Sequence, residues 1–123
     1  VYPDNLLAAK NCEGITYHAP YPVAQAVADE LRAKGCDLVV CLSHMGTYPD
    51  KPEDCCDTEL VAQTRNIDVV IGGHTHKVYE NLRIRNLDGQ EVPVCQMGKA
   101  GTQIGKIVVH FEGKQLQNGE NLD

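Results

Sequence analysis

The sequence lacks a long apolar run. Its longest stretches of consecutive apolar residues are about five residues, whereas a helix that crosses a bilayer needs roughly 20. It also lacks the charged segment, apolar core and cleavage site of a secretory signal, and it begins with valine instead of methionine. We therefore expect no membrane span and no targeting signal in this chain, which we expect to be the interior of a longer protein.

Clusters of basic residues are also missing. The 11 Lys and Arg residues are outnumbered by 17 Asp and Glu residues, for a net charge of −6, and they form no run or stripe. Proteins that bind nucleic acid carry a basic patch that neutralises backbone phosphates. The charge pattern therefore argues against a polymeric nucleic acid as a partner.

The six cysteines include no C-x-x-C pair, which argues against a zinc ribbon or a thioredoxin-type site. Cys41 and Cys95 lie in apolar runs, and we predict that both are buried as small apolar residues. The adjacent pair at 55–56 lies in an acidic loop. Two arrangements stay open for this pair: two free thiols, or a disulfide from one of them to Cys12 or Cys36. The redox compartment therefore stays open as well.

What the sequence does contain is the pattern of one globular domain with strands and helices in alternation. With 123 residues, of which 42% are hydrophobic, the chain is long enough to bury a core. Residues 23–35 predict a helix, because Val23, Val27 and Leu31 form one apolar stripe and Gly35 suits the position after its last turn.

A β-α-β unit follows this helix. Residues 37–44 and 66–74 are continuous apolar runs, as expected for strands that are covered on both faces. Between them lie a loop at 45–57 and a short helix at 58–65 that Asp57 could cap. Two strands joined through a crossover helix run parallel, so the predicted fold class is α/β.

Two more segments complete the predicted sheet. Residues 80–97 read as a hairpin that turns at Asp88-Gly89, which makes the sheet mixed. Pro93 cannot donate to a ladder, so it should lie at an edge or an irregularity. Residues 102–113 alternate between apolar and polar side chains and predict a last, half-buried strand, and the tail after Gly113 is polar and reads as loose.

Three histidines are the candidate functional residues. His44 ends the first strand of the unit and His74 the second, with His76 two residues beyond. Ligands bind at the carboxyl edge of open parallel sheets, so these side chains should meet there. Gly72 and Gly73 precede them and predict either a positive φ or a close approach of the backbone to the site.

This combination predicts a metal site. Residues two apart in an extended chain are separated by roughly 6.6 Å, which suits two imidazoles on two metal ions about 3.5–4 Å apart, or on one ion in a bent loop. His18 and His110 are predicted to be structural instead. The acidic side chains of the 45–57 loop are predicted to be solvated; they are Asp50, Glu53, Asp54 and Asp57.

The segment "GGHTH", with "LSHMG" upstream, resembles the calcineurin-like metallophosphoesterases and specifically their 5′-nucleotidase branch. The resemblance covers residues 36–111. It implies a mixed-sheet domain within a four-layer α/β/β/α sandwich and two divalent metal ions, which could be Zn, Mn, Fe or Co. It also implies that His44 and His74 bind one ion and His76 the other, that the substrate is a nucleotide or another phosphate ester, and that the protein is exported to the periplasm or cell surface.

The sequence departs from the family pattern in what it lacks. The early D-x-H segment, the bridging aspartate, the G-N-H-E/D segment and the nucleotide-binding carboxyl-terminal domain have no match. The resemblance therefore implies that residues 1–123 are the carboxyl-terminal half of a catalytic domain, with the remaining half as partner. Such a chain should bind at most one metal and be inactive alone, and no catalytic or substrate-binding residue is assigned.

Two alternatives use the same residues. The chain could be a module that binds one zinc ion through His44, His74 and His76, with water as the fourth ligand. It could also be an interaction domain that keeps the strands without the chemistry.

Overall fold

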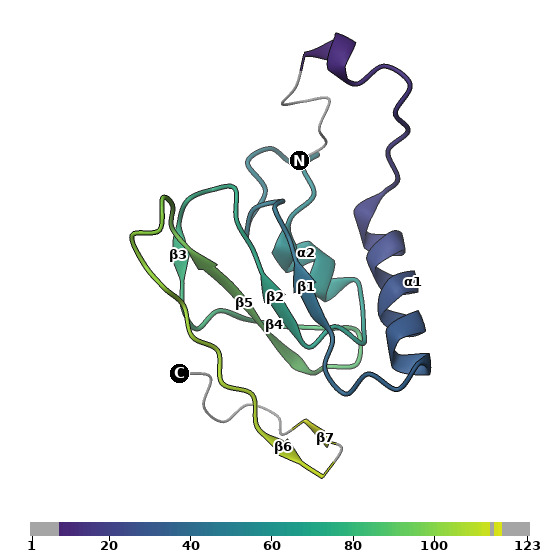
Figure 1. The fold of residues 1–123 in the computed structure, drawn as a ribbon, viewed down its shortest axis with the longest axis vertical. Coiled ribbons are helices and arrows are strands. Elements are labelled where there is room, and N and C mark those ends of the chain that lie inside the picture. Colours follow the sequence, from purple (N-terminus) through teal and green to yellow (C-terminus); the bar gives the residue numbers. More distant parts are fainter. Residues whose placement is uncertain (1–7, 114, 117–123) are drawn as a thin grey trace.

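The computed structural model describes residues 8–113 and 115–116 as one mixed α/β unit, which confirms the predicted fold class (Figure 1). A short 3-10 helix at Ala9–Asn11 precedes the helices α1 (Pro20–Ala33) and α2 (Asp57–Ala62). The strands are β1 (Val40–Leu42), β2 (Val69–Ile71), β3 (Val78–Tyr79), β4 (Arg83–Arg85), β5 (Glu91–Met97), β6 (Phe111–Glu112) and β7 (Gln115–Leu116).

The main sheet has five strands and mixed pairing. Its order is β1-β2-β5-β3, and β4 also pairs with β5. Strands β1, β2 and β5 run parallel, while β3 and β4 run antiparallel to β5. The predicted β-α-β unit is therefore confirmed, and so is the hairpin, which turns at Gly89 with a φ of +76°.

Helix α1 begins at Pro20, before the predicted residue 23, because proline suits the first helical turn. It ends at Ala33, and Gly35 follows its last turn as predicted, with a φ of +89°. The N–H of Gly35 donates to the carbonyl of Arg32 (2.9 Å), and the N–H of Cys36 donates to that of Leu31 (3.1 Å). This is the hydrogen-bond pattern of a Schellman motif.

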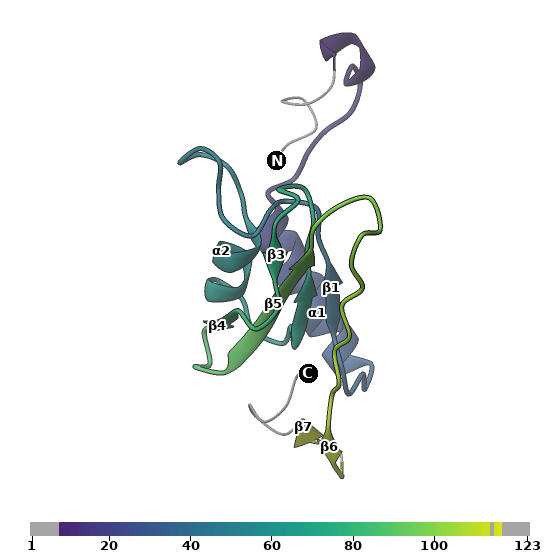
Figure 2. The same cartoon turned by 90° about the vertical axis from the view of Figure 1, so that its left-hand side faces the viewer.

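One face of the sheet carries the core. The strand register aligns Cys41, Val70 and Val94 in one row. Val70 and Val94 are fully buried and pack with Ala28 of α1 and Val61 of α2. Both helices therefore stabilise the same side of the sheet, and Figure 2 shows α2 on the side opposite the segment that leads to β6.

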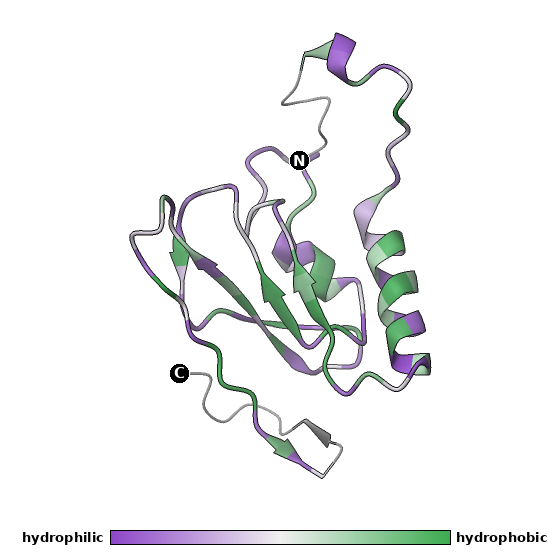
Figure 3. Cartoon of the chain, in the orientation of Figure 1, coloured by the Kyte–Doolittle hydropathy of each residue, from purple (hydrophilic) through white to green (hydrophobic). Residues whose placement is uncertain are grey.

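The other face of β1 and of the end of β2 is open, which corrects the prediction that both strands are covered on both sides over their whole length; Val69 of β2, in register with Val40, is buried. Leu42 is 79% exposed, and Val40 and Ile71 are each 42% exposed. The cause is the number of layers, because both helices share one face. Figure 3 shows the resulting hydrophobic strands beside polar loops.

The predicted strand at 102–113 is wrong for most of its length. Residues 103–110 form no ladder, Ile104 is 95% exposed, and only Phe111–Glu112 pair, with β7. Alternating polarity indicates which side chains can be buried, but a strand also needs a partner for its backbone hydrogen bonds.

Pro93 lies inside the central strand β5 and still satisfies the restriction on proline. The Val94 N–H donates to the Leu82 carbonyl on the β4 side (2.9 Å), so the Pro93 nitrogen faces the β2 side. Pairing with β2 begins only at Val94. The missing N–H of proline therefore interrupts no ladder.

Within the described residues, neither helix is long and apolar enough to cross a membrane.

Candidate functional site

The candidate site lies where β1 and β2 end. The backbone N–H of Ser43 donates to the carbonyl of Ile71 (2.9 Å), which continues the pairing one residue beyond β1. The rings of His44 and His74 follow and lie edge to face, with centroids 5.4 Å apart and planes at 71°. The predicted meeting of the three histidines at one edge is therefore confirmed for His44 and His74, while His76 does not join them in a group of three among the described residues.

The backbone strain lies on the histidines and not on the glycines before them. His74 has a φ of +83° and His76 a φ of +58°, whereas neither Gly72 nor Gly73 has a positive φ. The positive φ predicted at Gly73 is therefore wrong. A residue other than glycine in this region costs about 1–3 kcal/mol, and such strain persists where the surroundings fix it, as at many functional sites.

The two glycines are required by close packing, which was the other half of the prediction. A Cβ atom on Gly72 would lie 2.2 Å from Oδ2 of Asp57, and one on Gly73 would lie 2.9 Å from Nδ1 of His44. Both distances are shorter than van der Waals contact. The backbone after β2 therefore passes directly against two polar side chains of the site.

Asp57 is a site residue that the sequence analysis missed. It is 0% exposed, and its Oδ1 accepts a hydrogen bond from the Ser43 hydroxyl. It is the first residue of α2, and its side chain makes no cap hydrogen bond, so the predicted capping role is wrong. Burial raises the pKa of this carboxyl group, while the Ser43 hydrogen bond and the charge of His44 lower it.

The other acidic side chains of the loop agree better with the prediction that they are solvated. Asp50 and Glu53 are exposed, although the Asp50 carboxylate lies 3.9 Å from Nε2 of His74. Asp57 differs because its N–H donates to the Gly46 carbonyl (2.8 Å), which draws the start of α2 beneath the loop. In the sequence, the only signal for the burial of Asp57 was its position directly before the apolar residues of a helix.

A buried polar network supports the histidine-bearing loop and was also missed. The side-chain amide of Gln96 donates to the hydroxyl of Thr47 (2.8 Å) and to that of Thr75 (3.0 Å). Gln96 is 1% exposed and Thr47 is 0% exposed. The network connects β5 to the loops after β1 and β2. In the sequence, the only indication of this network was a glutamine in an otherwise apolar strand.

The side chains at this edge suit a transition metal but do not complete a site. Imidazole is a common ligand for Zn, Fe and Co, and Oδ2 of Asp57 is buried without a hydrogen-bond partner among the described residues. Over residues 8–113 and 115–116, no three His, Cys, Asp or Glu side chains are grouped closely enough to hold an ion. The side chain of His76 is exposed. The ligand roles of His44, His74 and His76 stay predictions, and the described geometry offers no support for a one-zinc module.

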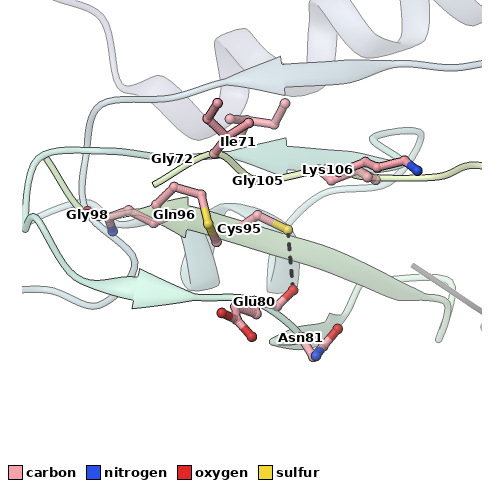
Figure 4. Close-up of a pocket in the computed structure, with 12 residues that line it drawn as sticks. Ile71, Gly72, Glu80, Asn81, Cys95, Gln96, Gly98, Gly105 and Lys106 are labelled. Carbon is pink, nitrogen blue, oxygen red and sulfur yellow. Dashed lines mark hydrogen bonds between the residues drawn. The ribbon is translucent and has the colours of Figure 1, made fainter. Parts of the chain in front are cut away.

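A groove of about 730 Å³ lies on the open side of the sheet, between β5 and residues 104–107 (Figure 4). Its lining includes the apolar side chain of Ile71, the Cys95 thiol and the charged residues Glu80 and Lys106. The Cys95 thiol contacts the carbonyl of Glu80 (3.9 Å).

The predicted burial is confirmed for Cys95, and Cys41 is half-buried. Burial raises the pKa of both thiols. Cys12, Cys36 and Cys56 also carry free thiols, so a bridge from Cys56 to either of the other two is absent.

Comparison with known proteins agrees with the predicted resemblance. No protein-family model matches the chain. A snake venom 5′-nucleotidase of Naja atra is 29% identical over 105 residues, which are 73% of this chain, and the 5′-nucleotidase of Rattus norvegicus is 30% identical over the same share. The matches span only 18% and 17% of those relatives.

The structural comparison gives the same result. The chain is similar to the 5′-nucleotidase precursor from Thermus thermophilus, with a TM-score of 0.63 and 28% sequence identity. The match covers 83% of this chain and 22% of that protein. The resemblance to 5′-nucleotidases is thus seen in both sequence and fold.

Proposed function

Because this chain resembles 5′-nucleotidases over most of its length, we propose that it is part of a metal-dependent phosphoesterase that hydrolyses nucleotide phosphomonoesters. The observation that carries the proposal is the pairing of His44 and His74, with ring centroids 5.4 Å apart, at the carboxyl ends of two parallel strands. This is the edge at which α/β sheets bind ligands.

In this proposal His44 and His74 bind one divalent ion, and His76 binds the second. Such ions, when bound, polarise the phosphoryl group and supply an activated water. The chain itself contributes orientation. The hydrogen bonds from Gln96 to Thr47 and Thr75 fix the loop that presents the imidazoles, and His74 and His76 take a positive φ within this loop.

Residues 1–123 would form the carboxyl-terminal half of the catalytic domain. A two-metal site needs carboxylates that bridge the ions and offset their charge. At this edge, Asp50 is largely exposed and Asp57 is fully buried. We therefore assign the bridging carboxylate, the remaining ligands and the nucleotide-binding residues to the remaining parts of the protein.

The open face of β1 and β2 would be the surface on which the remaining half packs. Leu42 and Ile71 are exposed there and are partners in the register, and Val40 is exposed two residues before Leu42 on the same face of β1. Exposed apolar patches of this kind mark interaction surfaces. The short span of the matches, 17–18% of the relatives, agrees with a chain that needs a partner segment.

We extend the proposal to location, with the protein acting in the periplasm or at the cell surface. The support is the family resemblance and the venom origin of a relative.

The test is phosphate release from AMP by the protein that contains this chain together with the remainder of its catalytic domain. His74→Ala should reduce the rate at least 10- to 100-fold, because the loss of even a residue that supports a metal ligand typically costs that much. His110→Ala, which changes an exposed histidine outside the pair, should leave the rate unchanged. Equal rates for wild type and His74→Ala would contradict the proposal.

A further inference from the structure

Residues 103–110 have the composition of a strand but no strand beside them. The segment contains no proline, and residues 107–109 are three consecutive β-branched residues. Its backbone N–H and C=O groups make no hydrogen bond to any other residue that the structure describes. Residues 107–109 are nevertheless half-buried. Backbone that leaves solvent normally pairs with another segment, and the described part of the chain does not supply that segment.

The segment lies on the open side of the sheet. A Cβ atom on Gly105 would lie 2.7 Å from Cγ of Met97, so the Gly105 backbone packs directly against β5. The groove between them is lined by Ile71 and Cys95 of the sheet and by residues 104–107 of the segment. Figure 2 shows the segment on the side of the sheet opposite α2. It therefore forms the start of a second layer and has no neighbour in that layer among the described residues.

Alternate side chains of the segment face the sheet. No residue of the segment has a positive φ, and in an extended chain residues two apart share a face. Ile107 and Val109 therefore share the face of Gly105, toward the sheet, and Lys106 and His110 lie on the outer face. The exposure agrees, because Ile107 and Val109 are half-buried while Lys106 and His110 are exposed. The backbone N–H and C=O groups of an extended chain point sideways, toward the two edges of the segment.

We propose that residues 103–110 dock a β-strand of the remaining half of the catalytic domain, which pairs with this segment backbone to backbone. The inference rests on the proposed function, which assigns that half to another part of the protein, and it names the element through which the two parts join. A strand offers a row of backbone donors and acceptors, as in β-augmentation. A helix satisfies its own backbone groups internally and would leave the segment unpaired.

The surroundings of the segment support this occupant. Leu42 is 79% exposed and Val40 is 42% exposed on the same side of the sheet, so a second sheet that continues from the segment would cover them. The relatives have chain for such a sheet, since the matches span only 17–18% of their length. The docked strand should carry apolar side chains opposite Ile107 and Val109 and no basic side chain opposite Lys106, because like charges directly opposite are destabilising.

The test is residue-level hydrogen–deuterium exchange of the protein that contains this chain together with the remaining half, compared with the isolated 123-residue chain. Unpaired amides exchange quickly, whereas amides in a stable ladder exchange only when the ladder opens. We expect alternate amides within residues 103–110 to exchange roughly 100-fold more slowly in the complete protein. Equal exchange rates in the two samples would overturn the proposal.

Proline substitutions test the backbone pairing directly. Val108→Pro removes an N–H on one edge of the segment and Val109→Pro removes one on the opposite edge, and proline is compatible with extended backbone at a strand edge. Val108→Thr and Val109→Thr are the matched controls, because threonine keeps the N–H and the β-branched shape. At least one proline variant should reduce the protection of the segment in the complete protein roughly tenfold, the effect of one lost hydrogen bond. Its threonine counterpart should keep most of that protection.

The isolated chain controls for folding. Neither proline variant should lower its melting temperature, because the N–H groups of residues 108 and 109 make no hydrogen bond to a described residue. If the complete protein protects the segment but both proline variants exchange as the wild type does, the segment is covered without backbone pairing and the proposal is wrong. Protection that grows with the concentration of the isolated chain would identify a second copy as the occupant, which would also overturn it.

The two hypotheses fail differently. A complete protein that protects residues 103–110 but shows no metal-dependent phosphate release from AMP contradicts the proposed function and leaves the docking of a strand intact. A complete protein that hydrolyses AMP but leaves residues 103–110 unprotected contradicts only the inference about this segment.

Discussion

At the scale of single residues, the backbone at Gly72 and Gly73 lies directly against two polar side chains of the site. The Gly72 position contacts the buried carboxyl group of Asp57, while the Gly73 position contacts the exposed ring of His44. A buried side chain held by a hydrogen bond cannot move away from an added methyl group, whereas an exposed imidazole can. The two adjacent glycines therefore differ in what they tolerate.

This difference predicts the order of two substitutions. Gly72→Ala should lower the free energy of unfolding by about 1–3 kcal/mol, as expected for overpacking. Gly73→Ala should cost less than about 1 kcal/mol, because neither glycine has a positive φ and only the His44 ring must move. Urea denaturation of both variants measures this. A larger loss for Gly73→Ala would mean that the 72–73 backbone lies differently from the arrangement described.

The thiols give a second prediction at this scale. Burial raises the pKa of Cys95 and, with the charge of Asp57, that of Cys41. The thiolate is the reactive form, so at pH 8 both should react more slowly with iodoacetamide than the exposed Cys36. Their rates should continue to rise above pH 9, because a raised pKa moves deprotonation to higher pH.

Mass spectrometry of labelled peptides after timed exposure measures the three rates separately. Labelling of Cys95 as fast as Cys36 at pH 8 would show that the groove side of β5 is open to reagent and that burial does not protect this thiol.

At the scale of elements, the sequence predicted correctly those features of the fold that depend only on residues close together in the chain. Gly35 follows the last turn of helix α1 as predicted, because a left-handed residue at that position depends only on the nearby backbone. The β4–β5 turn at Gly89 is local in the same sense. The parallel pairing of β1 and β2 followed from the crossover rule, which needs only the order of elements.

Elements that depend on distant partners were predicted less well. Residues 103–110 have the alternation of a strand but no ladder, and the apolar side chains of β1 are exposed on one side. A pattern of apolar and polar residues indicates which side chains can be buried against a partner. It does not indicate whether that partner is part of this chain. For the same reason, the convergence of His44 and His74 was predictable, whereas the burial of Asp57 beneath them was not.

At the scale of the whole molecule, one face of the sheet is covered by helices and part of the other face is exposed. Helices α1 and α2 pack on the core face, while Leu42 is 79% exposed on the other. Two imidazoles meet at the sheet edge, yet no three candidate ligands are grouped within the described residues. The open apolar face and the incomplete ligand set both agree with our proposal that the site is shared with another part of the protein.

The measurement that tests this central claim most directly combines metal content and phosphate release for the isolated 123-residue chain. After incubation with Zn²⁺ or Mn²⁺ and dialysis, elemental analysis should find at most one ion per chain. The same sample should release no phosphate from AMP above the buffer rate, because a second ion would meet uncompensated repulsion without a bridging carboxylate. Two ions per chain, with metal-dependent phosphate release that is lost in His74→Ala, would contradict the account and show that this chain carries a complete site.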